Sequence, residues 1–504
     1  MSRYVRALAI AGLILAISTS ALAGGPDTLW TRTFGWDDHW VSPGDRGSGI
    51  DLTEDGGAIM TGSGFQFELT PEEAFMIKLD RYGRAEWERF CCTWYRESGL
   101  SVICAPGGGY VMAGFAEVPP ERDWNVLLTY TDENGYLGWK RTYAGPGPAY
   151  GRAVATSVLP AHGGGYIVGA YTEDVESRHD DIYILRTDEK GDTLWARTYG
   201  GGRTERFESM VRDEFSGGYL ICGLTYSDDW LGQGLLLLKI DEGGDTLWTR
   251  VYDPPDLWVN GARVDQTGDG GYILGANVDL NTSSWGLREY HIQVIRVDAA
   301  GDTLWTRLLG GAGSDNCSDI IQTSDGGSAL LGSTDSFGAG GFDVYLVRMD
   351  ASGDTLWTRT YGGPHTDFGS EVVETPEGSY MIVGTTSSFG VSMSDAFVIK
   401  TRPDPVHGGS APPGLAVSEA WPNPVMTGTA FTVELTAPGE ITTTVYDVLG
   451  RLVAGPTTVQ AGYGFSEVPV QVENWDGEPL NSGIYFCTIE AAGRSETRKL
   501  VFVR

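Results

Sequence analysis

The chain has 504 residues, with 67 Asp and Glu against 35 Lys and Arg, so its formal net charge is −32 at pH 7. A chain this acidic repels phosphate backbones and anionic lipid head groups, which excludes nucleic acid as an expected partner. The length exceeds that of one ordinary domain. The 72 glycines and 11% aromatic residues indicate many tight turns between packed segments.

The first 23 residues have the pattern of a secretory signal peptide. Arg3 and Arg6 precede an apolar stretch over residues 7–17, which is too short to cross a bilayer comfortably. Ala21-Leu22-Ala23 supplies a small-x-small cleavage site. We therefore expect export through the periplasm, removal of residues 1–23, and no transmembrane segment in the mature chain. A retained N-terminal anchor is the alternative.

Beyond this leader, a tryptophan recurs every 52 to 57 residues. A fixed period of this length indicates one supersecondary unit that is copied along the chain. Several copies carry the phrase Gly-Asp-Thr-Leu-Trp, as at residues 244–248 and 301–305. The recurring residues are Trp30, Trp87, Trp139, Trp195, Trp248, Trp305 and Trp357.

Each period predicts four short strands with turn residues between them, and no long helical stretch. In the sixth copy the expected strands are 317–323, 328–333, 343–349 and 355–361. The first tryptophan strand, 28–34, has no partners before it, whereas the last copy, 369–401, lacks a tryptophan strand. The two incomplete ends are complementary, as a closed ring requires and an open solenoid does not.

This pattern predicts an all-β chain whose residues 24–402 form a seven-bladed β-propeller, with the N-terminal strand completing the last blade. The tryptophans are expected to pack between adjacent blades. The turn at Thr187–Trp195 resembles the Asp-box hairpin of sialidase-type propellers, and the repeats resemble those of bacterial exported propellers. The arginine triad and Tyr/Glu pair of sialidases have no counterpart in this sequence, so the resemblance implies a fold and not that activity.

The loops of the repeat differ sharply in how much they vary. The hairpins on one face are nearly the same in every copy, whereas the loops on the other face vary in length and are rich in aromatic and acidic residues. Variable loops on a fixed scaffold indicate a binding face. Packing of the aromatic rings on the blade beneath is the alternative. The predicted ligand-binding residues are Trp36, Asp38, His39, Trp94, Trp124, Trp230 and Trp285.

Such loops suit stacking on sugars, peptide capture or calcium-assisted glycan binding. The sequence has no nucleophile elbow, zinc-protease helix, phosphate loop or dinucleotide fingerprint, so no catalytic residue is predicted and an enzyme is disfavoured. No cofactor is expected, and calcium is the metal that the acidic loops would suit. We expect a non-catalytic protein that binds a glycan or a protein. A secreted hydrolase of polysaccharide or peptide and a structural matrix component are the alternatives.

The six cysteines do not follow the repeat, and none has the Cys-x-x-Cys spacing of a zinc site. Export permits disulfides, and Cys92 with Cys104 is the favoured pair by proximity. Buried free thiols are the alternative.

Residues 403–414 are rich in Pro and Gly and predict a linker. Beyond it the repeat stops, and alternating apolar and polar residues, as at 430–435 and 484–489, predict a small immunoglobulin-like β-sandwich over 415–504.

The tail contains four ordered motifs, at residues 422–424, 447–451, 480–485 and 499–504. Together they resemble the C-terminal sorting domain of type IX (Por) secretion. Residues 475–477 with 482–485 also resemble FlgD-type immunoglobulin-like domains. The resemblance implies recognition by the secretion machinery, passage across an outer membrane, and release or attachment at the cell surface. A plain sandwich spacer is the alternative. The residues that match are Pro422, Asn423, Pro424, Asp447, Gly450, Arg451, Gly483, Tyr485 and Lys499.

Overall fold

The structure is a computed structural model that describes most of the chain beyond residue 26. The described residues are 27–35, 44–65, 71–91, 95–119, 123–145, 150–174, 179–226, 233–252, 258–279, 289–390, 393–404, 415–417, 425, 429–435, 439–448, 450–461, 464–470, 472–473, 479–491 and 494–503. They contain β-strands and no helix, which confirms the all-β class. The predicted signal peptide and most of the predicted linker, residues 405–414, lie outside this part of the chain.

Four consecutive antiparallel strands form each of the first six blades, and a single parallel pairing of Arg152 with Trp124 joins blades 2 and 3 into one sheet. Blades 1 to 3 are β2 (Arg46–Leu52), β3 (Ala58–Gly64), β4 (Glu73–Leu79) and β5 (Ala85–Phe90); β6 (Glu97–Cys104), β7 (Tyr110–Val118), β8 (Asp123–Thr131) and β9 (Leu137–Tyr143); and β10 (Tyr150–Pro160), β11 (Tyr166–Asp174), β12 (Asp180–Thr187) and β13 (Thr193–Tyr199).

Blades 4 to 6 follow the same plan. They are β14 (Glu205–Arg212), β15 (Tyr219–Tyr226), β16 (Gln233–Ile240) and β17 (Thr246–Tyr252); β18 (Trp258–Gln266), β19 (Tyr272–Asp279), β20 (Tyr290–Val297) and β21 (Thr303–Leu309); and β22 (Asp315–Gln322), β23 (Ser328–Thr334), β24 (Asp343–Met349) and β25 (Thr355–Tyr361). The last blade contains β26 (Asp367–Glu374), β27 (Tyr380–Thr386) and β28 (Asp395–Thr401).

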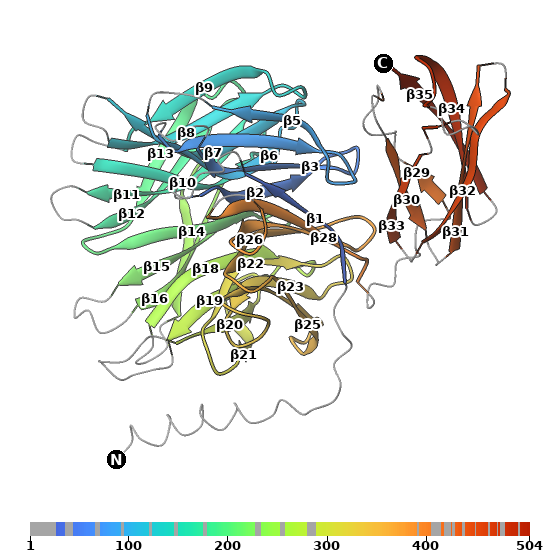
Figure 1. The fold of residues 1–504 in the computed structure, drawn as a ribbon. Helices are drawn as coiled ribbons and strands as arrows, with labels where there is room; N and C mark the ends of the chain where they lie inside the picture. Colours follow the sequence, from blue (N-terminus) through green and yellow to red (C-terminus); the bar gives the residue numbers. More distant parts are fainter. Residues whose placement is uncertain are drawn as a thin grey trace.

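The N-terminal strand β1 (Thr28–Phe34) pairs antiparallel with β28, so the last blade takes its fourth strand from the other end of the chain (Figure 1). The first strands of neighbouring blades lie against one another, and β2 lies against β26 and β27. The Ile50 amide of β2 donates to Glu371 Oε2 of β26 at 2.8 Å. The first strand of each blade is therefore the innermost one, and the fourth strand is outermost.

Six of the seven outer-strand tryptophans pack on a glycine turn of the next blade, and Trp357 packs on Tyr380 of the last blade instead. A Cβ added at Gly353 would lie 2.6 Å from the Trp305 ring, and one at Gly83 would lie 2.7 Å from the Trp30 ring. Both glycines have positive φ, at +79° and +76°, which favours glycine in these turns. The recurring tryptophans are therefore packing residues between blades, as the repeat predicts.

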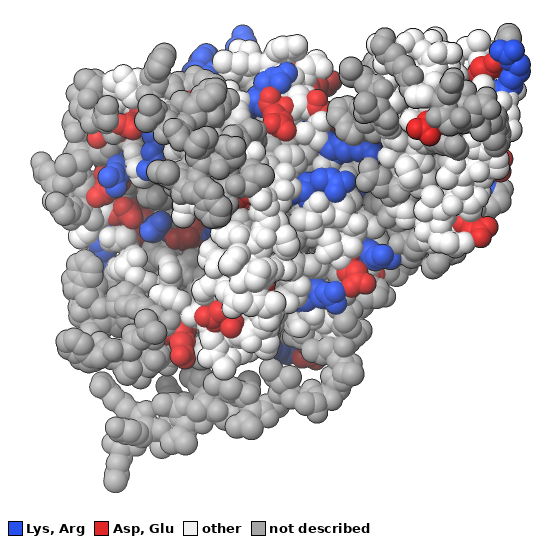
Figure 2. Space-filling model, viewed as in Figure 1, with Lys and Arg blue, Asp and Glu red and all other residues white. Residues whose placement is uncertain are grey.

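The arginine two residues after each tryptophan also bridges blades. Arg307 lies 3.5 Å from Asp354 of the next copy, and Arg359 lies 2.7 Å from Asp27. Figure 2 shows Lys and Arg side chains lying next to Asp and Glu over the face that it draws. Because Asp27 begins the first copy of the Asp-Thr-Leu-Trp phrase, β1 occupies the same place in its blade as the other tryptophan strands.

Replacing Trp305 with alanine should lower the free energy of unfolding by about 2 kcal/mol, since the half-buried ring fills the joint between blades 5 and 6. Urea denaturation measures the change. The matched control is the neighbouring Leu304→Ala, whose side chain is 57% exposed and should change stability by under about 0.5 kcal/mol. An unchanged midpoint for Trp305→Ala would refute the packing role.

The third strand of most blades contains a buried cation that the sequence pattern concealed. In five blades this cation forms an ion pair with an acidic residue in the turn between the first and second strands of the same blade. In blade 3 the cation is Arg186, which donates to backbone carbonyl oxygens of that turn. Lys78 Nζ, for example, lies 2.7 Å from Asp55, and Lys400 Nζ lies 2.7 Å from Glu377. The buried cations are Lys78, Arg186, Lys239, Arg296, Arg348 and Lys400.

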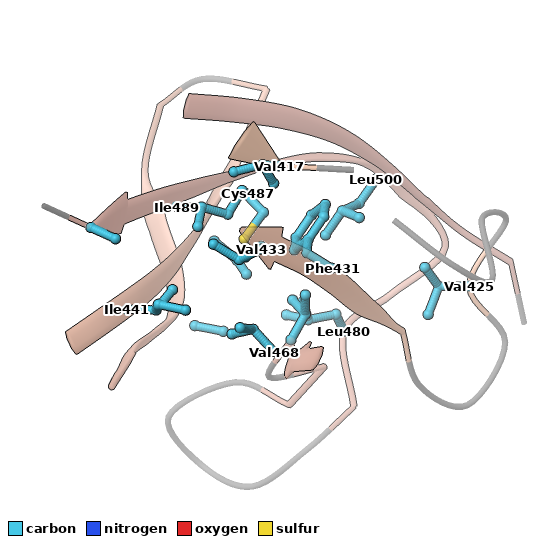
Figure 3. Packing of buried hydrophobic residues seen from close by; sticks show 14 of the residues in the cluster. Val417, Val425, Phe431, Val433, Ile441, Val468, Leu480, Cys487, Ile489 and Leu500 are labelled. Carbon is cyan, nitrogen blue, oxygen red and sulfur yellow. The ribbon is translucent and has the colours of Figure 1, made fainter. Parts of the chain in front are cut away.

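The C-terminal part is a sandwich of two antiparallel sheets. One sheet contains β29 (Leu415–Val417), β30 (Ala430–Leu435) and β33 (Gly464–Pro469), and the other contains β31 (Gly439–Asp447), β32 (Leu452–Ala461), β34 (Gly483–Ala491) and β35 (Arg494–Phe502). Figure 3 shows side chains from both sheets meeting in one core, among them Phe431, Ile441, Cys487 and Leu500.

Cys104 is a free thiol, and its Sγ lies 3.3 Å from the Leu52 carbonyl oxygen. Cys92, the other member of the predicted pair, lies outside the described residues, and Cys104 itself is a thiol in this structure. Burial raises the pKa of Cys104 to about 12, so the thiol stays protonated. No described segment forms a helix long and apolar enough to cross a membrane.

Candidate functional site

Of the predicted ligand-binding residues, Trp124 is the one that the described part of the chain contains. Trp36, Asp38, His39, Trp94, Trp230 and Trp285 lie outside it. Trp124 stands at the start of β8 and pairs with Glu117 near the end of β7. It therefore lies at the end of its blade opposite the first hairpin, on the face with the variable loops.

Trp124 packs within the fold. Its ring stacks on Phe115, with centroids 4.5 Å apart and 17° between the planes. The guanidinium groups of Arg152 and Arg96 lie 4.7 Å and 5.2 Å from the ring centroid. Cations over an aromatic face stabilise such a cluster. The sequence analysis gave packing on the blade beneath as the alternative to ligand binding for the loop aromatic residues, and Trp124 packs in this way. A role of Trp124 in binding stays a prediction.

Carboxylates on the innermost strands join neighbouring blades near the axis. Each accepts a hydrogen bond from a backbone amide of the next first strand. The pairs are Asp51 with Cys104 N at 2.8 Å, Asp265 with Gln322 N at 2.7 Å, Asp319 with Val372 N at 3.0 Å and Glu371 with Ile50 N at 2.8 Å. Burial raises the pKa of all four carboxyl groups, because the charged form loses solvation near the axis.

A cavity of about 450 Å³ opens where the first strands of blades 3 to 6 end. This volume is in the range of small-ligand sites. Its lining is mixed, with apolar Leu159 and Val211 and polar Asp265, Gln266 and Gln322. The cavity lies on the face with the nearly invariant hairpins. The sequence pattern predicted a binding site on the opposite face, among the variable loops, and did not predict this cavity.

Phe215 at the cavity mouth is 63% exposed and comes from an unusual turn. In blade 4 the Asp213 amide donates to Gly218 O at 3.0 Å, whereas in blade 5 the Thr267 amide donates to Gly271 O at 2.9 Å. The turn of blade 4 is therefore one residue longer. This insertion is visible in the sequence when the copies are aligned, and it is the signal that could have found the site.

Asp265 is the ionisable group of the cavity whose pKa moves toward neutrality. Burial raises this pKa to about 6, against the hydrogen bonds from the amides of Gln322 and Gln266. Within the described residues no three His, Cys, Asp or Glu side chains are grouped as metal ligands would be. The prediction of calcium in the loops stays a prediction.

The raised pKa of Asp265 predicts a pH dependence of stability. As the pH rises from the ordinary pKa of 3.8 to about 6, the carboxyl group of Asp265 loses its proton in the unfolded chain but keeps it in the folded chain. The protonated carboxyl group therefore stabilises the fold at low pH, and this stabilisation is lost as the pH rises through about 6. Urea denaturation from pH 4 to 7 should show the stability of wild type falling relative to Asp265→Asn by roughly 2 kcal/mol. A pH-independent difference between the two proteins would contradict the assignment.

The tail motif at Asp447–Arg451 forms a turn that the propeller also uses. The Asp447 amide donates to Arg451 O at 2.9 Å, and the Gly450 amide donates to Asp447 O at 3.0 Å. In the turn Asp80–Arg84 of blade 1, the matching bonds are 2.8 Å and 3.0 Å. Gly450 has a φ of +75°, which favours glycine. In this structure Asp447 and Gly450 thus shape a hairpin.

The other described motif residues lie at the same end of the sandwich. Tyr485 pairs with Asp447 across β34 and β31, packs edge-on against Phe502 at 5.1 Å and donates its hydroxyl to Asn481 O at 3.1 Å. Gly483 begins β34, and Lys499 of β35 pairs with Phe486. Pro422, Asn423 and Pro424 lie outside the described residues.

Comparison with known structures gives distant likenesses. PorZ, a surface component of the type IX secretion system of Porphyromonas gingivalis, is 13% identical over 90% of this chain, which spans 59% of PorZ, with a TM-score of 0.39. An α-L-arabinanase of Penicillium chrysogenum is 9% identical over 75% of this chain and 98% of its own, with a TM-score of 0.42. Such likenesses are too distant to bear on function. No curated protein sequence matches the chain.

The tail gives a clear result. Residues 419–503 match the family model of the secretion system C-terminal sorting domain. This confirms the resemblance that the four tail motifs indicated. The chain is thus an exported β-propeller protein of the cell surface or the exterior, whose C-terminal part is a secretion-system sorting domain.

Proposed function

We propose that the propeller is a non-catalytic binding domain that the tail delivers to the cell exterior. It binds a glycan or a protein segment in the cavity where the first strands of blades 3 to 6 end. The observation that carries this proposal is the state of the cavity carboxylates. Both oxygens of Asp265 accept backbone amides, those of Gln266 and Gln322. Glu214 is paired with Arg212. Carboxylates engaged in this way hold the scaffold and are poorly placed for acid–base chemistry.

The lining favours a ligand with an apolar face and several hydroxyl or amide groups. The exposed ring of Phe215 offers a stacking platform, as aromatic rings do for sugar rings and for peptide side chains. Gln322 brings a side-chain amide to the same cavity, whereas the side-chain amide of Gln266 is already bonded to Asp213 and to the Glu214 amide. A glycan segment matches this combination best, with a peptide as the second choice.

A secreted hydrolase is the second candidate, favoured by one observation. The pKa of Asp265, at about 6, lies in the range of a general acid. Glycoside hydrolysis, however, uses two carboxyl groups in the site. The second carboxylate of the cavity, Glu214, has its Oε1 bound by Arg212.

The test is binding of the purified full chain to arrays of glycans and cell-wall polysaccharides, with and without calcium, together with assay of released product. Saturable binding that Phe215→Ala weakens at least about tenfold would support the proposal. The matched substitution Trp124→Ala, on the opposite face, should leave affinity unchanged. If Trp124→Ala alone abolishes binding, the variable face is the site. Product release would favour the hydrolase, and absence of any binding would favour a structural component.

A further inference from the structure

The joint between blade 6 and the last blade contains a second cavity, of about 200 Å³. Residues of the outer strands β25 and β1 bound it, and Thr31 and Phe389 are its exposed members. Phe397, Ile399 and Asp367 are buried members of the lining, and Asp367 is only 1% exposed. This space holds several water molecules, at about 30 Å³ each, or an alkyl chain that ends in one charged group. We call it the joint cavity.

Asp367 faces a second buried carboxyl group, that of Asp343 in blade 6, which is 2% exposed. Oxygens of both groups lie so close to Gly362 that a Cβ added there would overlap them. Burial raises the pKa of Asp343 against the bond from a backbone amide, and the charge of Asp367 raises it further. Two carboxylates held together away from water are costly unless a proton or a cation accompanies them.

Within the described part of the chain, neutral donors alone bind these two carboxyl groups. Asp367 accepts hydrogen bonds from the Thr386 hydroxyl, from the Ser388 hydroxyl at 2.6 Å and from the Gly363 amide at 2.9 Å. Asp343 accepts one from a backbone amide at 2.6 Å. Their charge is therefore not balanced by a basic side chain of the described residues.

The joint between blades 1 and 2 has the same backbone arrangement. There Glu97 takes the place of Asp367. The Glu97 amide donates to Glu72 O at 2.8 Å, and the Asp367 amide donates to Phe342 O at 2.6 Å. Each acceptor directly precedes the third strand of the preceding blade. The two acidic residues are thus equivalent positions of the repeat.

In blade 2 a lysine neutralises this position. Lys140 Nζ lies 2.6 and 2.7 Å from the two carboxyl oxygens of Glu97. Lys140 directly follows the tryptophan of its outer strand, and the residue that follows Trp30 in β1 is Thr31. Thr31 lines the joint cavity. The cavity therefore lies where the repeat places an ammonium group in blade 2.

The joint between blades 5 and 6 is balanced in another way. Asp315 is the counterpart of Asp367 and accepts the matching bonds from two hydroxyls and an amide. Its neighbour across Gly310 is His291 Nδ1, where the cavity joint has the second carboxyl group. Of these three joints, the one with the cavity is the one in which carboxyl groups meet without a basic side chain.

The walls of the joint cavity suit an alkyl stem. Tyr361, Phe397 and Ile399 are buried apolar members of the lining, and aromatic rings also attract cations. Arg359 belongs to the lining as well, but its guanidinium is paired with Asp27 at 2.7 Å. Apolar walls that lead to a buried carboxylate match a chain with a positive end.

We propose that the joint cavity binds a primary ammonium group on an alkyl stem, with Asp367 as its acceptor and Asp343 as the second negative charge. A lysine side chain of a protein segment and a small amine both offer this chemistry. The proposal does not depend on what the cavity between blades 3 to 6 binds.

The test is calorimetric titration of the purified full chain with Nα-acetyl-lysine amide. The matched ligand is Nα-acetyl-norleucine amide, which has the same alkyl chain without the ammonium and should bind at least about tenfold more weakly. Asp367→Asn should weaken binding of the lysine derivative by a similar factor. Phe215→Ala, in the other cavity, should leave it unchanged.

The repeat itself supplies the sharpest variant. Thr31→Lys should place an ammonium in the cavity as Lys140 does in blade 2, so the lysine derivative should no longer bind and the thermal midpoint should not fall. The matched control is Thr33→Lys on the same strand, which is exposed and outside the lining and should bind as wild type.

A peptide with a central lysine separates the two sources. Binding at least about tenfold tighter than that of the lysine derivative assigns a protein segment, and equal binding assigns a small amine. Absence of saturable binding would overturn the proposal, as would binding that survives both Thr31→Lys and Asp367→Asn. A midpoint that calcium raises in wild type but not in Thr31→Lys, without binding of the lysine derivative, would also overturn it, because the site would then hold a metal ion.

Discussion

Replacing Asp404 with alanine should lower the free energy of unfolding by about 4 kcal/mol, as when one partner of a buried ion pair is removed. The buried Asp404 carboxylate accepts bonds from Arg348 Nε and Trp357 Nε1, both at 2.9 Å, and from the Tyr380 hydroxyl at 3.0 Å. Arg348 and Trp357 belong to blade 6, and Tyr380 belongs to the last blade. Alanine would therefore leave three buried donors unpaired at one joint.

Urea denaturation of the full chain measures this effect, and Asp354→Ala is the matched control. Asp354 is 74% exposed and pairs with Arg307 at the surface, so its loss should cost under about 1 kcal/mol. If Asp404→Ala unfolds at the same urea concentration as this control, Asp404 does not hold the two blades together.

The second large effect is expected from Asp213→Asn, at about 3 kcal/mol. Asp213 and Lys239 form an ion pair whose side chains are each 2% exposed. Asp213 also accepts bonds from Tyr272 and Gln266 of blade 5, both at 2.7 Å. Burial alone would raise the pKa of Asp213, but the bonds from Lys239, Ser216 and Tyr272 hold it well below the ordinary 3.8.

The sign of the pH dependence follows from this lowered pKa. The contribution of Asp213 is present above about pH 4 and is lost as the pH falls toward its folded value, so the gap between wild type and Asp213→Asn should narrow in strong acid. Lys239→Met should destabilise less than Asp213→Asn, because Asp213 keeps its neutral donors. A larger loss from Lys239→Met would contradict this account.

The propeller class could be predicted from the sequence because its determinants repeat at fixed positions. Trp305 and its six counterparts recur at a nearly even spacing, each with an arginine two residues later, and the hairpin glycines recur with them. The buried cations also repeat, yet they were missed. Lys239 and Arg348 differ in type and stand in otherwise apolar strands, and their acidic partners come from another turn. An ion pair across strands has no signature in either strand alone.

Residue-level prediction failed for Asp404 and for the cavity for similar reasons. Asp404 falls within the Pro- and Gly-rich stretch that predicted a linker from residue 403, although its side chain is buried in the propeller. The cavity arises where the ends of four strands from different blades meet, and no local pattern encodes such a meeting. The tail was predicted well because its motifs are local: Asp447 and Gly450 shape one turn, and Tyr485 stands opposite.

The pairing of β1 with β28 also bears on when the protein can become resistant to proteases. Six blades consist of consecutive strands, so each can form as soon as it has left the inner membrane. Closure of the ring comes later, because the contact between Arg359 and Asp27 joins residues 332 apart and requires nearly the whole propeller. Until then the chain is an open arc with β1 unpaired, and unpaired strand edges invite aggregation. A periplasmic protease could thus distinguish chains interrupted before β28 from complete ones.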